Sequence, residues 1–180
     1  MDWLKLLKED PESFQDEADA AAADVQMPGA GLAGATLDGV NLWNANLAGA
    51  DLSGATLEDC NLGFCDLTGA NLSGATIESC AMRQSDFRKA NLDGVNAVDW
   101  KLDKAKLAGA SLKGVEFEMV SLDGADLKGA DLSGAKLNEV IAEGADFSGV
   151  TWTGATLVGC VFTDCVLDLD GVTLEDTVLG

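Results

Sequence analysis

The sequence contains no histidine and no tyrosine, and only 6% of its residues are aromatic. Without histidine, the chain lacks the commonest general base and a common ligand of zinc and other transition metals. The hydrophobic content is 47%, so the apolar bulk must come from leucine, valine and alanine. This composition disfavours an enzyme before any motif is considered.

Basic residues are also scarce, with 11 Lys and Arg against 31 Asp and Glu in 180 residues. The net charge of −20 argues against direct nucleic-acid binding, because phosphates would be repelled. It is compatible with a surface that imitates nucleic acid for a basic groove. No apolar run is long enough to span a bilayer, and the start MDWLKLLKEDP is too short and too acidic for a secretory signal. We therefore expect a cytoplasmic protein without membrane contact, whose five cysteines are reduced thiols.

Apolar residues recur at every fifth position. From Met27 to Leu167 this register holds for 29 consecutive positions without an insertion, and 19 of them are leucine. Two residues earlier in each unit the side chain is Ala, Val or Cys, with Ser85 and Trp100 as the exceptions. Neither a helix, with a period of about 3.6, nor a plain strand, with a period of about 2, keeps such a stripe on one face. The pattern predicts a solenoid in which each unit supplies one short extended side and a corner.

The last residue of each unit indicates how many sides make one coil. At intervals of twenty residues from Gly34 to Gly154, this residue is glycine in all seven cases, whereas the other three corner positions are mixed. The sequence therefore predicts coils of twenty residues with four sides. Glycine is expected at a corner where the backbone needs positive φ or close approach.

Many units read Ala-(Asp/Asn)-Leu-x-x, as in Ala45-Asn46-Leu47 and Ala130-Asp131-Leu132. This motif resembles the pentapeptide-repeat family, and the resemblance runs continuously over residues 25–167. It implies an all-β solenoid, a right-handed quadrilateral parallel β-helix of about seven coils. At the spacing of neighbouring strands, about 4.8 Å, the coils would form a rod of roughly 34 Å.

The two ends of the chain depart from the repeat. We expect residues 1–24 to form an N-terminal helical cap, with a short helix over about 11–23, because proline favours the first helical position. Such a cap would cover an open solenoid edge. Residues 25–167 form the predicted β-helix, and beyond them the register slips by two. Residues 168–180 are therefore expected to form an irregular C-terminal coil.

All five cysteines occupy the small inward position of their units. We interpret them as core residues, because free cysteine packs as a small hydrophobe. Cys60 and Cys80 lie on the same side in successive coils, so distance alone does not exclude a disulfide. A zinc site would need further ligands. We expect no metal, no cofactor and no catalytic residue, since a filled rod offers no cleft that would shift pKa values around a substrate.

Carboxylates form an acidic stripe along one side of the predicted rod, interrupted by Val98. The acidic stripe consists of Asp38, Glu58, Asp59, Glu78, Asp99, Glu118 and Glu139. Some members of the pentapeptide-repeat family inhibit DNA gyrase or protect it from quinolones. The resemblance implies that they act as acidic, rod-shaped dimers in the DNA-binding saddle of the enzyme. The acidic stripe is the feature that such a DNA mimic would use.

The charge distribution weakens this analogy. Residues 27–82 sum to −6, residues 83–113 to +3 and residues 114–167 to −7. A basic waist divides the acidic segments and consists of Arg83, Arg88, Lys89, Lys101, Lys104, Lys106 and Lys113. The uninterrupted register also leaves no room for the projecting loops of many quinolone-resistance members. The alternative interpretation of the acidic stripe is a solubilising surface charge.

Two outward apolar clusters indicate interaction surfaces. Trp43 and Phe64 project from the same side in adjacent coils, and Arg83 follows one coil further, near enough for a cation–π contact. These three are the candidate partner-binding residues, unless the N-terminal helix covers them. Near the other end, a candidate homodimer interface consists of Ile141, Val158, Val161 and Val166.

The sequence thus predicts a non-catalytic scaffold. It would bind a protein partner, whose identity the sequence does not give, through the faces of a rigid acidic rod. The alternative hypothesis is a DNA mimic that inhibits or protects a type II topoisomerase such as DNA gyrase.

Overall fold

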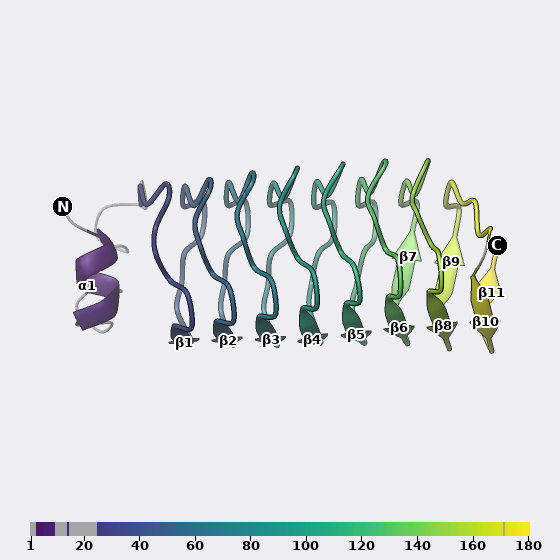
Figure 1. Cartoon of the computed structure of the whole chain (residues 1–180), viewed down its shortest axis with the longest axis horizontal. Coiled ribbons are helices and arrows are strands. Elements are labelled where there is room, and N and C mark those ends of the chain that lie inside the picture. The colour runs from purple at the N-terminus through teal and green to yellow at the C-terminus, as the bar shows by residue number, and fades with distance from the viewer. Residues whose placement is uncertain (1–2, 10–13, 15–24, 171) are drawn as a thin grey trace.

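The chain folds into a rod built from stacked coils. The computed structural model describes residues 3–9, 14, 25–170 and 172–180. From residue 25 onward the backbone winds as a parallel β-solenoid of about seven turns, and the short helix α1 (Trp3–Glu9) lies at its N-terminal end (Figure 1). The solenoid confirms the fold class that the five-residue period predicts.

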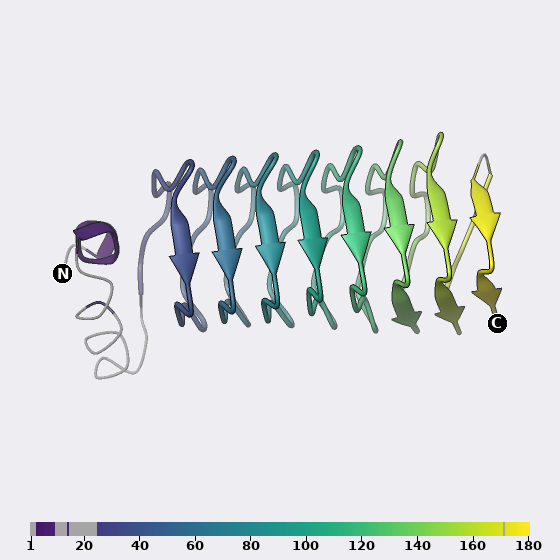
Figure 2. The same ribbon diagram turned by 90° about the horizontal axis from the view of Figure 1, so that it is seen from below.

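One side of the rod is an eight-stranded parallel sheet with the strand order β1-β2-β3-β4-β5-β6-β8-β10 (Figure 2). Each strand has three residues, and they are β1 (Thr36–Asp38), β2 (Thr56–Glu58), β3 (Thr76–Glu78), β4 (Asn96–Val98), β5 (Glu116–Glu118), β6 (Lys136–Asn138), β8 (Thr156–Val158) and β10 (Thr173–Glu175). Thr36 pairs with Thr56, and Thr56 with Thr76. This register confirms the predicted coil of twenty residues.

The next side carries a smaller parallel sheet near the C-terminus. Its strands are β7 (Ile141–Glu143), β9 (Val161–Thr163) and β11 (Val178–Leu179). The two remaining sides are held by isolated parallel bridges with the same offset, such as Asn46 to Asp66 and Asp51 to Asn71. Four sides of five residues therefore make each coil.

The corners share one backbone conformation. Every corner residue from Gly29 to Asp164, at intervals of five, has positive φ. Glycine adopts this conformation freely, whereas an L-residue in it is less stable by about 1–2 kcal/mol. Asn44, Phe64 and Lys104 nevertheless occupy such corners with φ of 59°, 61° and 57°. Positive φ therefore explains why glycine is common at corners, but nothing in the structure explains why one column is glycine in all seven coils.

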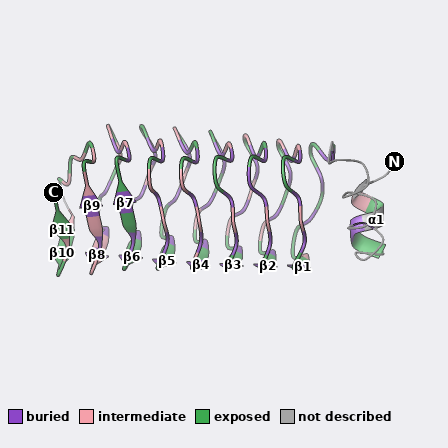
Figure 3. Cartoon of the chain, turned by 180° about the vertical axis from the view of Figure 1, so that it is seen from behind, coloured by how far each residue is buried: buried purple, intermediate pink, exposed green. Residues whose placement is uncertain are grey.

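The interior of the rod is filled by the two inward positions of each unit. Leucine and the other large residues alternate with alanine, valine and cysteine, and nearly all of these side chains are buried from Val25 to Phe162 (Figure 3). Trp100 occupies the inward position that holds a small residue in the other units, and it is fully buried. Its ring packs edge-on against Phe87 and Phe117, with centroids 5.9 and 5.7 Å apart. Two aromatic neighbours thus accommodate the oversized residue.

The ends of the rod differ from its middle. Leu4 and Leu7 of α1 pack against the core. The helix predicted over 11–23 lies outside the described residues except for Phe14, which is helical and fully buried. At the other end, β10 and β11 pair with β8 and β9 at an offset of 17 residues, as in Thr173 with Thr156. The last coil is thus three residues shorter than the others.

Trp100 gives a test of how strictly the core is packed. Trp100→Ala should destabilise the protein by about 3–5 kcal/mol, because it leaves a large cavity beside two aromatic rings. Trp100→Phe should cost less than half as much, since it keeps an aromatic ring and removes an indole N–H that has no hydrogen-bond partner among the described residues. Urea unfolding followed by circular dichroism measures both. Equal losses for the two variants would contradict this account of the site.

Candidate functional site

The Asp or Asn in the second position of many units binds the backbone of its own corner. The backbone N–H of Ser53 donates to Asp51 Oδ1 at 3.1 Å, and that of Ser73 donates to Asn71 Oδ1 at 3.2 Å. Asp and Asn are interchangeable in this role, because each offers a side-chain oxygen to the N–H two residues on. These carboxylates therefore support the fold and are not candidates for chemistry.

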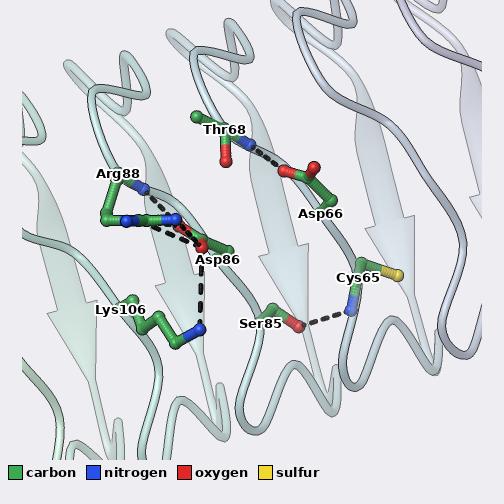
Figure 4. Close-up of polar contacts among 7 residues, drawn as sticks. All are labelled: Cys65, Asp66, Thr68, Ser85, Asp86, Arg88 and Lys106. Atoms are coloured by element: carbon green, nitrogen blue, oxygen red, sulfur yellow. Dashed lines mark hydrogen bonds and ion pairs between the residues drawn. The ribbon is translucent and has the colours of Figure 1, made fainter.

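Most cations of the basic waist are paired with carboxylates of the same or a neighbouring coil, and Figure 4 shows two of them, Arg88 and Lys106. Arg88 Nε and Nη2 donate to Asp86 at 2.8 and 2.6 Å, and Lys106 Nζ lies 3.7 Å from the same carboxylate. Burial acts to raise the pKa of Asp86, but Arg88 and then Lys106 outweigh it, and the pKa is lowered. Arg83, Lys101 and Lys113 also form ion pairs, whereas Lys89 and Lys104 form none among the described residues. Five of the seven cations of the basic waist are thus paired with carboxylates.

The acidic stripe is continuous only in the first three strands. Asp38, Glu58 and Glu78 occupy equivalent positions of β1, β2 and β3, and all three are exposed. Val98 separates them from Glu118 in the paired register of β3, β4 and β5. The corner residues of the stripe beside this column are Asp59, Asp99 and Glu139, and Asp99 is neutralised by Lys101. Glu118 and Glu139 also form no ion pair among the described residues, but the run of carboxylates on adjacent strands lies toward the N-terminal end.

The surface around this part of the acidic stripe has no cation of its own. Residues 27–82 contain six carboxylates and neither Lys nor Arg. None of the six forms an ion pair among the described residues, whereas the ion pairs of the rod all lie between Arg83 and Asp146. The electrostatic character of the rod changes at its third coil.

Trp43 and Phe64 form one exposed aromatic cluster. Their ring centroids are 4.5 Å apart and their planes are tilted by 54°. The two residues are 44% and 41% exposed, so α1 does not bury them. A Cβ on Gly63 would lie 2.8 Å from Cζ3 of Trp43. Gly63 therefore lets the indole ring lie against the backbone of the next coil, which sets the orientation of the pair.

Arg83 does not join the aromatic pair. Its Nε donates to Asp103 Oδ2 at 2.7 Å, and among the described residues no cation–π contact joins it to Trp43 or Phe64. A charge-assisted hydrogen bond to a carboxylate is stronger than an exposed cation–π contact. The structure therefore brings together two of the three candidate partner-binding residues.

The candidate dimer residues lie on three different sides of the rod. Ile141 and Val161 are paired in the small sheet, and β11 adds Val178 to the same outward row. Val158 belongs to the large sheet, and Val166 follows the next corner. Leu174 and Leu179 occupy inward positions of the last coil but are 43% and 47% exposed. Apolar surface thus continues from the outward row onto the C-terminal end.

The comparisons with known proteins agree with this geometry. A family model described as a pentapeptide repeat region matches residues 70–147, and one described as pentapeptide repeats (8 copies) matches 29–63 and 143–179. The chain belongs to the pentapeptide-repeat family. No curated protein matches it in sequence.

Solved structures of other pentapeptide-repeat proteins resemble the rod. A trypsin-treated variant of QnrB1, a plasmid-mediated fluoroquinolone resistance protein, has a TM-score of 0.56 at 24% identity, over 86% of this chain and 79% of that chain. HetL, a pentapeptide-repeat protein involved in heterocyst differentiation regulation from the cyanobacterium Nostoc sp. strain PCC 7120, has a TM-score of 0.38 at 22% identity, over 91% and 90%. At these identities, the likeness to QnrB1 shows the fold alone.

The cysteines of this pentapeptide-repeat protein are free thiols in or beside its core. Cys65 Sγ donates to the carbonyl of Leu42 at 2.9 Å, and burial raises the pKa of Cys65 to about 12. Ser85, the polar exception in the small column, donates to the carbonyl of Leu62 at 2.6 Å and accepts the N–H of Cys65 (Figure 4). These groups pack and hydrogen-bond inside the rod, where they are unsuited to nucleophilic chemistry.

The described residues contain no group of three side chains suited to a metal ion. No helix in the described part of the chain is long and apolar enough to cross a membrane. Shallow hollows lie on the outer face of the large sheet, lined by residues of β4, β5, β6 and β8 such as Val98, Glu118 and Asn138. Their lining contains no Cys, Ser or His, and two of its charged groups, Lys136 and Glu116, are paired with each other at 2.6 Å.

Sequence reasoning missed three features of these surfaces. Gly63 lies twenty residues after Trp43, so the coil period places it directly beside the indole, and this signal was available. Met119 is 43% exposed at a corner with φ of 55°. The exposure of Leu174 and Leu179 follows from their place at the end of the rod, which the repeat pattern does not mark.

Asp146 allows the corner hydrogen bonds to be tested by pH. The Ser148 hydroxyl, then Lys128 Nζ at 2.9 Å, and the Ser148 N–H lower the pKa of Asp146 to about 2, from an ordinary value of 3.8. Its stabilising effect should be present above about pH 4 and lost as the pH falls toward 2. Asp146→Asn keeps the oxygen acceptor but not the charge. It should lower the Tm slightly at pH 7 and not at all at pH 2.

The controls for this experiment separate charge from hydrogen bonding. Asp146→Ala should lower the Tm more than Asp146→Asn at pH 7, because it also removes the acceptor for the corner N–H. Asp38→Asn removes a carboxylate with no hydrogen bond or ion pair among the described residues, and should not lower the Tm. Thermal unfolding followed by circular dichroism measures all three variants. A difference between Asp146→Asn and the wild type that persists at pH 2 would contradict the prediction.

Proposed function

We propose that this pentapeptide-repeat protein is a non-catalytic scaffold that binds another protein through the outer faces of its rod. The observation that carries the proposal is the exposed pair of Trp43 and Phe64 on an otherwise regular surface. Aromatic residues are enriched at the energetic centres of protein interfaces. A rigid solenoid holds such residues in place without paying for their ordering when the partner binds.

The rest of the surface supports the same proposal. The inward side chains fill the rod, and two charged groups that line the shallow hollows, Lys136 and Glu116, are paired with each other. Most remaining polar groups are used within the fold, either at corners or in ion pairs between coils. The surfaces that remain for a partner are the aromatic pair, the acidic stripe and the apolar C-terminal end. We place this activity in the cytoplasm, where the free thiols stay reduced.

Affinity capture from a lysate of the source organism tests the scaffold proposal. The wild type is compared with two variants. The first combines Trp43→Ala with Phe64→Asn, and the second combines Asp38→Asn, Glu58→Gln and Glu78→Gln. Asparagine suits position 64, because Asn44 occupies the equivalent corner one coil earlier with nearly the same φ. We expect a partner that the wild type retains and that one of the surface variants loses by at least tenfold, since losing about 1.4 kcal/mol or more of binding free energy has this effect.

Met119→Ala is the matched control for this capture. Met119 is exposed to the same extent as the aromatic pair and also occupies a corner, so its loss reports on nonspecific apolar adsorption. The retained partner should bind this variant as it binds the wild type. An identical set of captured proteins for all variants would contradict the scaffold proposal.

The second candidate function is DNA mimicry toward a type II topoisomerase. It is favoured by the in-register carboxylates of Asp38, Glu58 and Glu78, which no cation of the rod neutralises. The chain also shares its fold with QnrB1, a fluoroquinolone resistance protein. Such mimicry needs an acidic track of greater length than three strands. A homodimer through the apolar C-terminal end, including Ile141 and Val161, would join the acidic segments of residues 114–167, each with a net charge of −7, at the centre of a longer rod.

Two measurements test this second candidate together. Native mass spectrometry at micromolar concentration should show a dimer, and purified DNA gyrase should lose supercoiling activity or regain it in the presence of a fluoroquinolone. Glu58→Gln, Glu78→Gln should weaken the effect on gyrase without changing the dimer, because the carboxylates lie far along the chain from the C-terminal end. A monomer that leaves gyrase unchanged under both conditions would exclude DNA mimicry.

A further inference from the structure

The aromatic pair lies in a part of the rod that contains carboxylates but no cation. Trp43 and Phe64 both fall within residues 27–82, which contain six carboxylates and no Lys or Arg. Asp66 follows Phe64 by two residues. Asp59 is the corner residue that precedes Phe64 by one side of the coil. Both carboxylates are exposed. Phe64 is thus flanked by negative charge along its own coil, one coil from Trp43.

The geometry of the pair leaves ring surface open to a ligand. The rings touch each other at a tilt of 54°, so they do not cover each other face to face. Each keeps about two fifths of its side chain exposed. Gly63 holds the indole against the neighbouring coil, because any larger residue there would meet the ring. The exposed surface is therefore fixed in orientation before a partner arrives.

We propose that this aromatic pair binds an arginine-bearing basic segment of the protein partner. The proposal rests on the proposed scaffold function and names the chemistry of the partner. A guanidinium group stacks on the face of an aromatic ring and is attracted by the ring quadrupole. The surrounding carboxylates attract the same cation and steer the basic segment to the site.

The charges of the chain itself leave this position vacant for an incoming cation. Arg83, one coil further, is held by Asp103 at 2.7 Å. Arg88, whose positive charge is also attracted by Asp66, donates to Asp86 with two of its nitrogens. A nucleic acid could also stack on the rings, but its phosphates would be repelled by the six carboxylates. An arginine-bearing protein segment satisfies both the rings and the charge.

Peptides of defined charge test the proposal. Fluorescently labelled octa-arginine and octa-lysine are titrated against the full chain, and binding is followed by fluorescence anisotropy. Both peptides carry the same charge, but arginine also stacks on aromatic rings. The wild type should bind octa-arginine about fivefold to tenfold more tightly than octa-lysine, which corresponds to one or two exposed cation–π contacts.

Substitutions in the aromatic pair test the contribution of the rings. Trp43→Ala and Phe64→Asn should each weaken octa-arginine binding by about threefold to fivefold and leave octa-lysine binding nearly unchanged. Gly63→Ala, which displaces the indole without removing it, should have an effect of the same sign. Met119→Ala removes an exposed apolar side chain elsewhere on the rod and should change neither affinity.

Substitutions of the flanking carboxylates test the contribution of the charge. The double variant Asp59→Asn, Asp66→Asn should weaken the binding of both peptides by the same factor, because it reduces only the attraction between opposite charges. The asparagine introduced by Asp66→Asn keeps a side-chain oxygen, so it would still accept the corner N–H of Thr68, which Asp66 accepts at 2.9 Å. The local fold is therefore retained while the charge is removed.

Several outcomes would overturn the proposal. Equal affinity for the two peptides, unaffected by Trp43→Ala, would show attraction by diffuse charge alone. Absence of octa-arginine binding at low salt would exclude a basic segment. Binding of an uncharged proline-rich peptide that survives 0.5 M salt and is lost in Trp43→Ala would assign the pair to an apolar ligand. Circular dichroism of each variant confirms that the solenoid is retained.

The failure of this proposal is distinguishable from failure of the scaffold function. If lysate capture yields a partner that the acidic-stripe variant loses, while the peptides show no preference for arginine, the scaffold function holds and the arginine proposal fails. If the peptides show the preference but no partner is retained by the wild type, the surface is a cation site and the scaffold function fails.

Discussion

The whole rod depends on the parallel register of twenty residues between successive coils. Backbone hydrogen bonds join each unit to the one twenty residues away, as from Leu47 N–H to the carbonyl of Asp66 at 2.7 Å. The register holds only if every side has the same length, and this requires a corner with positive φ after every fifth residue. Sequence freedom is therefore confined to outward positions. Any specific function of this chain has to be built from those positions.

The register also determines the electrostatics of the surface. Outward residues twenty apart become neighbours at strand spacing, about 4.8 Å, where like charges oppose each other. From Arg83 onward, ion pairs join some of these neighbours, as in Lys136 beside Glu116 at 2.6 Å. Residues 27–82 contain no cation, and Asp38, Glu58 and Glu78 repeat the same charge. That repulsion is relieved only by solvent, salt or a cationic partner.

Periodicity was sufficient to predict the solenoid, the coil length and the buried positions, because these follow from counting residues. It could not predict the partner of Arg83, since Phe64 and Asp103 are both one coil away and the choice depends on the relative strength of two contacts. Counting located the register slip of the last coil, where Leu174 pairs with Leu157, but it did not predict that Leu174 is exposed there. A periodic pattern predicts neither which of two nearby groups a side chain will bind nor how the end of the chain is exposed.

The aromatic cluster is where the chain departs most from its own rules. Phe64 holds positive φ, which disfavours a bulky L-residue by about 1–2 kcal/mol, although asparagine or glycine serves at most other corners. Gly63 does not occupy a corner, and its lack of a side chain makes room for the indole ring. A glycine at this position is unfavourable for stability, because glycine loses more conformational entropy on folding than other residues. Trp43 leaves a large apolar ring in water. None of these choices strengthens the register, and strained or locally unfavourable residues persist in proteins chiefly at functional sites. Their coincidence at one exposed position, inside the uncompensated acid, is the physical reason for placing the function of the rod there.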